Sequence, residues 1–301
     1  MYKKIINYLL SLFDAKIIRY QKSLPINLTK NNFHPRTFNY LCDQKKIIVN
    51  LNIENGRTNR FFSLDYNSFD PYLFSIKRSL KDNCKQKDLN ASILMMIEDY
   101  KKKIILNNLS DFFGLNPYEN KKLNTYPIWA SIMPWESLSI DEKFLNFPKS
   151  VKVDRAKNGY LIESNDPKVI MKKDQANSLP SHVNQYVSLI NSIKKNGYIP
   201  DVKNSFIEVE ILVKDEEFCW KPSGEGNHRT TVVASLGYKT IKSLVTKVVR
   251  FEDAKYWPNV VNGTFKKNEA EQIFNRYFEA NPPNFNKDWI LYCKELISSE
   301  S

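Results

Sequence analysis

Residues 223–230 read Ser-Gly-Glu-Gly-Asn-His-Arg-Thr, and the patterns on either side of this run indicate the fold. Before it, residues 207–213 alternate in hydrophobicity as a strand does, and a short polar turn leads into a second strand. After it, residues 229–236 suit a short helix that Gly237 ends, and residues 240–250 return to a strand pattern. This order of strands, glycine loop, helix and strand predicts an α/β (α+β) protein.

The glycine loop has the composition of an anion-binding turn. Gly224 and Gly226 permit positive φ angles, and the loop leads into a helix N-terminus, where free N–H groups favour a phosphate. Arginine can bind phosphate with two parallel hydrogen bonds. Five side chains of the loop add hydrogen-bond donors: Ser223, Asn227, His228, Arg229 and Thr230. A carboxylate repels phosphate, so Glu225 is interpreted as a base, a magnesium ligand or a clamp on Arg229.

A purely structural interpretation of the loop competes with this one. Strand–glycine–helix turns are common, and a lone histidine is more often a satisfied structural residue than a catalyst. Neither G-x-G-x-x-G nor G-x-x-x-x-G-K-[ST] is present, so Rossmann and P-loop chemistry are unsupported.

Helices are predicted before and after these strands in the sequence. Ser181 directly follows a proline and is predicted to cap a helix that Gly197 ends. Residues 257–264 form either a turn or a lid over the loop, and helices follow at 268–279 and 286–297.

Three parts of this region resemble one known superfamily. The run Ser-Leu-Ile-Asn-Ser-Ile-Lys-Lys-Asn-Gly at 188–197 precedes a strand, Gly-Glu-Gly-Asn-His-Arg follows at 224–229, and Val-Ala-Ser-Leu-Gly at 233–237 precedes the closing strand. In order and spacing, residues 180–250 are similar to the ParB N-terminal/sulfiredoxin-like superfamily. The resemblance implies that residues 121–301 form such a domain and that its loop binds a nucleotide or phosphate.

Differences from the superfamily's branches narrow the implied activity. Sulfiredoxins carry a catalytic cysteine where this chain has Asn227, so thiol chemistry is not expected. ParB-type partition proteins have two arginines where this chain has Gly226 and Asn227. The serine-kinase-like members have D-G-x-x-R, which Glu225, Gly226, His228 and Arg229 resemble.

The kinase-like resemblance implies transfer of a phosphoryl group to a small hydroxyl compound, or nucleotide hydrolysis. Glu225 and His228 would be catalytic, and the ligand would be ATP, ADP or CTP with Mg²⁺. The family also uses a second acid, for which the candidates are Glu136, Glu208 and Glu210. The alternative is a non-catalytic protein, either a nucleotide-gated or DNA-associated regulator or an assembly protein that only shares the fold.

Residues 1–120 are predicted as an additional, mostly helical N-terminal region of mixed helix and strand, separate from residues 121–301. Residues 2–20 fit an amphipathic helix that lies either on a membrane surface or against the rest of the protein. Residues 46–53 alternate like a strand, and residues 89–106 place their apolar side chains on one face of a helix.

Residues 126–136 combine two prolines with two tryptophans, so they are predicted as an irregular segment. One interpretation is a loop that its large aromatics hold against the core. The other is an aromatic wall of a ligand site, with Glu136 and Arg155 as polar contributors.

Composition limits the class of protein further. The 301 residues are 42% hydrophobic, contain no apolar run long enough to cross a bilayer, and carry a net charge of +12. The first 150 residues hold 23 basic and 14 acidic side chains. Any DNA or anionic-membrane partner would therefore bind this half of the chain, unless the charge only forms a lysine-rich surface.

Only nine basic residues are arginines, which suggests that each arginine serves a role that lysine cannot. The four cysteines form no C-x-x-C, which argues against a zinc ribbon and fits a cytoplasmic protein.

Overall fold

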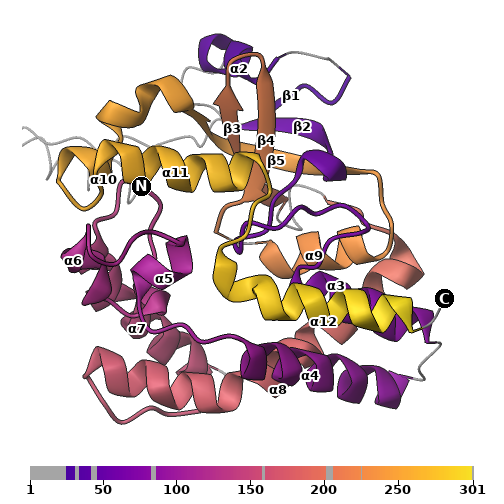
Figure 1. Cartoon of the computed structure of the whole chain (residues 1–301). Helices are drawn as coiled ribbons and strands as arrows, with labels where there is room; N and C mark the ends of the chain where they lie inside the picture. The colour runs from indigo at the N-terminus through magenta and orange to yellow at the C-terminus, as the bar shows by residue number, and fades with distance from the viewer. Residues whose placement is uncertain are drawn as a thin grey trace, which may run out of the picture.

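A five-stranded mixed sheet organises the part of the chain that the computed structural model describes, namely residues 25–30, 34–41, 46–82, 86–157, 160–200, 206–224 and 226–299 (Figure 1). The strand order is β1-β2-β5-β3-β4, with β1 parallel to β2, β2 antiparallel to β5, and β3 parallel to β5 and antiparallel to β4. The strands are β1 (Ile26–Asn27), β2 (Ile47–Asn52), β3 (Ile207–Lys214), β4 (Glu217–Pro222) and β5 (Thr240–Arg250).

The α-helices within these residues are α2 (Pro35–Leu41), α3 (Pro71–Lys81), α4 (Gln86–Lys103), α5 (Leu109–Phe113), α6 (Lys121–Asn124), α7 (Ile140–Lys157), α8 (Pro167–Asn196), α9 (Asn227–Ser235), α10 (Pro258–Val261), α11 (Lys267–Phe278) and α12 (Lys287–Ser298). Short 3₁₀ turns are η1 (Ile53–Asn55), η2 (Ile128–Ala130), η3 (Phe251–Tyr256) and η4 (Asn284–Asn286). The protein is therefore a mixed α/β protein, as the sequence predicts.

The two faces of the sheet carry different helices, because successive side chains of a strand point to opposite faces. Val209 and Ile211 of β3 belong to a core that contains side chains from α3, α4, α8 and α9. Leu212 of the same strand and Cys219 of β4 belong to a second core, with side chains from α5, η3 and α11. A third cluster packs α12 against α3 and α4.

The boundary predicted between residues 120 and 121 does not coincide with a break in the sheet or in the core. Strand β2 pairs with β5 along its whole length, from Ile47 opposite Val245 to Asn52 opposite Thr240. Strand β2 needs hydrogen-bond partners for its buried backbone, and β5, almost 200 residues later in the chain, provides them. Segments on both sides of the predicted boundary therefore build one sheet.

One predicted helix start is wrong, and most other predicted elements are confirmed. Helix α8 begins fourteen residues before Ser181, at Pro167, where the Asp166 side chain accepts hydrogen bonds from Lys168 N and Val169 N. Pro180 lies inside the helix and has no N–H to donate to the preceding turn. Because Pro180 is exposed, the helix tolerates the loss of this hydrogen bond. The predicted end is confirmed, since Gly197 has φ 74°.

The strand predicted at 240–250 is found at those residues, and those predicted from 207 and 218 and the helices from 229, 268 and 286 begin within two residues of their expected positions. The helix predicted at 2–20 lies outside the described residues. Among the residues that are described, no helix is both long and apolar enough to span a membrane.

Candidate functional site

The loop between β4 and α9 has the backbone that its glycines predict. Gly224 has φ 59° and Gly226 has φ 118°, both in the region that favours glycine. A Cβ on Gly226 would lie 3.2 Å from the Cα of Ile207, so a side chain would push the loop away from β3. Ser223 N also donates to Glu208 O at 2.9 Å, which joins the loop to β3. The predicted catalytic residue Glu225 lies outside the described residues.

Three of the predicted phosphate ligands use their side chains to hold the loop itself. The Ser223 hydroxyl bonds the Thr246 hydroxyl at 3.0 Å, and Asn227 Nδ2 donates to Gly224 O at 3.2 Å. The Thr230 hydroxyl donates to Gly226 O at 3.0 Å, and Thr230 is buried. Ser223, Asn227 and Thr230 therefore have structural partners, and the groups of the loop that would suit an anion are the backbone N–H groups before the first helical hydrogen bond of α9.

A turn at residues 58–62, which sequence reasoning missed, lies against the start of α9. Asn59 Nδ2 donates to Asn227 Oδ1 at 3.0 Å. Within the turn, Thr58 N donates to Phe62 O at 2.8 Å, and Phe61 has φ 69°, a strained value for a side chain of this size. Phe61 is fully buried against Tyr277 at 4.3 Å between ring centroids, and this packing supports the strained backbone.

Arg60 is the charged residue that this turn brings to the loop. Its guanidinium lies 4.6 Å from the centre of the Tyr72 ring, and its Nη1 lies 3.5 Å from Asp70 Oδ2. Asp70 is buried and caps α3 by accepting from Tyr72 N and Leu73 N, while one third of the Arg60 side chain is exposed. The scarcity of arginine was the sequence feature that could have drawn attention to Arg60. No sequence pattern, however, places residue 60 next to residue 227.

His228 faces a group of rings beside Arg60. Its ring meets Tyr186 edge-on at 4.7 Å and lies 5.7 Å from the His182 ring. Burial, with smaller contributions from the nearby His182 and Arg60, lowers the pKa of His228 to about 4. His228 is therefore neutral at pH 7, so one of its ring nitrogens can donate a hydrogen bond and the other can accept one.

The lowered pKa of His228 predicts a pH-dependent stability. The unfolded chain takes up a proton as the pH falls below about 6.5, whereas the folded chain takes it up only near pH 4. The contribution of neutral His228 to the free energy of unfolding is therefore fully present above pH 6.5. On the order of 3 kcal/mol of it is lost as the pH falls to 4. We expect His228→Gln to lose less stability than the wild type between pH 7 and pH 4.5 in urea unfolding. Equal losses in the two proteins would contradict this assignment.

The other predicted site residues separate into two groups. Arg229 lies near Tyr198. Burial raises the pKa of Tyr198, and the positive charge of Arg229 offsets part of that rise. Glu208 lies beside the loop, with Oε2 4.0 Å from the position of a Cβ on Gly224, and its Oε1 pairs with Lys46 at 2.6 Å.

The candidate acids Glu210 and Glu136 belong to a different, buried cluster. Glu210 Oε2 lies 3.3 Å from Lys221 Nζ and accepts from Trp135 Nε1 at 3.0 Å. Burial raises the pKa of Glu136, which Lys221 offsets in part. Among the three candidate acids, Glu208 is the one beside the glycine loop.

A cavity of about 400 Å³ borders the His182 and Tyr72 side of this site. It lies between α4, η2, α7 and α8, and Trp129 forms part of its wall. Trp135 is buried, in edge-to-face contact with Trp257 at 5.3 Å. The segment 126–136 therefore combines both interpretations, since Trp135 anchors it to the core and Trp129 lines a cavity. Of the two expected polar contributors, Arg155 contacts this wall through Asp174, at 2.6 Å, and Glu136 is in the buried cluster with Lys221.

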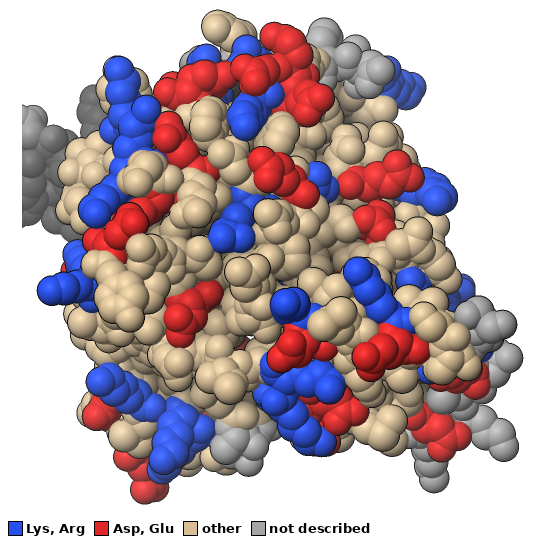
Figure 2. All heavy atoms as spheres, viewed as in Figure 1, with Lys and Arg blue, Asp and Glu red and all other residues tan. Residues whose placement is uncertain are grey.

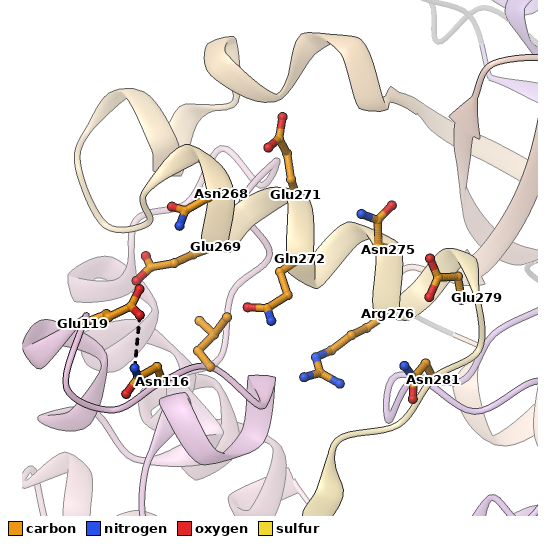
Figure 3. Close-up of a pocket in the computed structure, with 11 residues that line it drawn as sticks. Asn116, Glu119, Asn268, Glu269, Glu271, Gln272, Asn275, Arg276, Glu279 and Asn281 are labelled. Atoms are coloured by element: carbon orange, nitrogen blue, oxygen red, sulfur yellow. Dashed lines mark hydrogen bonds between the residues drawn. The ribbon is translucent and has the colours of Figure 1, made fainter.

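The largest of the cavities described here, about 650 Å³, lies elsewhere, along α11 and the 115–119 loop (Figure 3). Carboxylates and carboxamides dominate its lining, and Arg276 is the cation among them. Its buried carboxylate, Glu269, holds Asn120 Nδ2 at 2.9 Å and Lys266 N at 2.8 Å and so serves the start of α11. Because carboxylates repel phosphate, the phosphate site predicted from the sequence does not belong in this cavity.

The described residues contain no cluster of protein side chains that could hold a metal ion by themselves. No group of three His, Cys, Asp or Glu side chains comes together within them, and the loop's described neighbour, Glu208, is paired with Lys46. On the face shown in Figure 2, basic side chains are mixed with acidic ones and form no continuous basic area. This view gives no support to a DNA-binding surface on that face.

Comparison of the chain with protein-family models, curated proteins and solved structures found no match. The resemblance to the ParB N-terminal/sulfiredoxin-like superfamily therefore stays a prediction from the residues.

Proposed function

We propose that this protein binds a nucleotide, or another ligand with a phosphate group, at the start of α9. One observation carries the proposal: the turn at Gly224 and Gly226 brings the N-terminus of α9 into hydrogen-bond contact with the turn that bears Arg60. A helix N-terminus and a guanidinium each favour a phosphate, and Arg60 directly follows Asn59, the residue that contacts the start of α9.

The surroundings of Arg60 support this role. Asp70 and the Tyr72 ring hold the guanidinium in place, so little side-chain entropy is lost when a ligand binds. Neutral His228 can donate a hydrogen bond to a phosphate oxygen. A bound dianion would also raise the pKa of His228 from about 4 and make it a better proton acceptor.

Phosphoryl transfer to a small hydroxyl compound, or nucleotide hydrolysis, is the activity that we propose for this site. Such catalysis depends mainly on positioning and charge stabilisation. Glu225 and His228 would move the proton, Arg60 and Arg229 would hold phosphate oxygens, and Glu208 is a further carboxylate beside Gly224. A protein that binds nucleotide without turnover would instead be a nucleotide-gated regulator.

Binding is tested by thermal shift with ATP, ADP, CTP and GTP, each with and without Mg²⁺, since a ligand that binds only the folded state raises the melting temperature. We expect Arg229→Ala to weaken binding by about 2–3 kcal/mol, roughly 30–150-fold in Kd, because charge-assisted hydrogen bonds are lost. Arg60→Lys keeps the charge next to Asp70 and loses the planar fork, so we expect about tenfold weaker binding.

Arg250→Gln is the matched control, because Arg250 ends β5 and lies 3.9 Å from Glu252 and Asp253, away from α9. Its binding should equal that of the wild type. If Arg229→Ala and Arg60→Lys also bind as the wild type does, the site is assigned wrongly. If none of the four nucleotides shifts the melting temperature, nucleotide binding is wrong.

A further inference from the structure

The cavity of about 400 Å³ beside His182 has an aromatic wall. Trp129 and Phe147 line it from η2 and α7, and Tyr72 lines it from α3. The Trp129 ring stacks on Phe144, with centroids 5.0 Å apart and planes 20° apart, so its orientation is held from one side. A flat, rigid aromatic side chain at a cavity wall suits a planar ligand.

The same cavity carries an excess of positive charge. Lys101 and Lys143 line it, and Asp174 is the carboxylate in its lining. Asp174 Oδ1 is bound to Arg155 Nε at 2.6 Å, so its charge is compensated within the protein. Burial lowers the pKa of His182, and Arg155 lowers it further, while Asp174 opposes this effect and Lys101 adds a smaller contribution in the lowering direction.

The size of the cavity limits its ligand to a small molecule. A volume of about 400 Å³ lies at the lower end of the range for small-molecule sites. Ser178 and Gln175 add hydrogen-bonding groups to the lining, while Leu179 and Met171 add apolar surface. The wall is therefore complementary to a molecule with a planar apolar part and an anionic group.

We propose that this cavity is a binding site for an aromatic anion, with the ring of the ligand against Trp129 and its carboxylate or phosphate near Lys101 and Lys143. The site is separate from the phosphate site at α9, and the inference holds whether or not α9 binds a nucleotide. His182 forms the wall between the two, because its ring also lies 5.7 Å from that of His228.

Tryptophan fluorescence gives a direct test. Of the five tryptophans, Trp135, Trp220, Trp257 and Trp289 are at least 95% buried, and Trp129 lines the cavity. We expect salicylate and phenyl phosphate to quench the emission with saturation, whereas benzylamine, which carries the opposite charge, should not. Lys143→Gln and Lys101→Gln should each raise the Kd about tenfold, and Trp129→Phe should abolish the quenching but retain binding in calorimetry.

Lys121→Gln is the control, since Lys121 is exposed on α6 and does not line the cavity. AMP and its uncharged counterpart adenosine test whether the aromatic anion is a nucleotide. AMP binding that depends on Lys143 and is unchanged in Arg229→Ala would indicate a nucleotide in this cavity rather than at α9. Absence of saturable quenching by all three anions would overturn the proposal, as would equal affinities for salicylate in the wild type and in both cavity lysine variants. Loss of nucleotide binding in Arg229→Ala with the salicylate affinity unchanged would confirm two separate sites.

Discussion

Replacing Lys221 with methionine should lower the free energy of unfolding by about 3–5 kcal/mol, because the change leaves a carboxylate buried without its counter-ion. Glu210 and Lys221 are 8% and 5% exposed, and Nζ and Oε2 lie 3.3 Å apart. Burial alone would raise the pKa of Glu210, but Lys221, the Trp135 indole and Lys247 outweigh it and leave the pKa below its usual value. Urea unfolding at pH 7 measures the loss.

The double variant Lys221→Met/Glu210→Gln separates the ion pair from simple loss of packing. It removes both charges and keeps a hydrogen-bond acceptor for Trp135, so it should recover most of the stability lost in Lys221→Met. Protonation of Glu210 at low pH should also remove the unpaired buried charge. The difference in the free energy of unfolding between the wild type and Lys221→Met should therefore shrink below pH 5. A single variant that loses less than about 1 kcal/mol would show that the pair is not buried and charged as described.

Replacing Asp70 with alanine should cost about 2–4 kcal/mol, because Asp70 both caps α3 and neutralises Arg60. Its carboxylate accepts from Tyr72 N at 3.1 Å and Leu73 N at 3.2 Å and lies 3.5 Å from Arg60 Nη1, while the side chain is only 1% exposed. Asp70→Asn keeps the cap and loses the charge, so it should lose less stability than Asp70→Ala, by about 1 kcal/mol. Chemical unfolding of both variants gives the two contributions.

Asp166 is a matched control within the same chain. It caps α8 with the same pattern, accepting from the second and third residues after it, and a proline follows it as Pro71 follows Asp70. Asp166 is exposed, so Asp166→Ala should lose only the cap, about 1 kcal/mol. Equal losses for Asp166→Ala and Asp70→Ala would mean that Asp70 adds nothing beyond capping and that Arg60 is not held by it.

The glycine loop shows how far local sequence reaches toward the candidate site. Gly224 and Gly226 predict a turn with positive φ, and the turn is found, because the absence of a Cβ acts within a residue or two. The role of Ser223, Asn227 and Thr230 could not be predicted in the same way. A hydroxyl or amide in a loop can bind a ligand or its own backbone, and only the folded arrangement shows that these three hold the loop.

Arg60 shows what local sequence could not indicate. Its place beside α9 depends on the strained turn at Phe61, the buried Tyr277 ring behind it, and the hydrogen bond from Asn59 to Asn227. These contacts join residues more than 160 positions apart, and no periodicity or spacing in the sequence records them. Trp129 and Trp135 are similar, since composition predicted an aromatic segment but not which ring would line a cavity.

The sequence by itself determined the mixed α/β class, the strands beginning at 207 and 240, and the end of α8 at Gly197, because periodicity and glycine conformation act over a few residues. Tertiary structure decided that β2 pairs with β5, that α8 continues through Pro180, and that Arg60 lies near enough to His228 to lower its pKa. The physical reason is that unpaired strand edges and apolar helix faces accept many partners, and the choice among them is made by the packing of the whole chain.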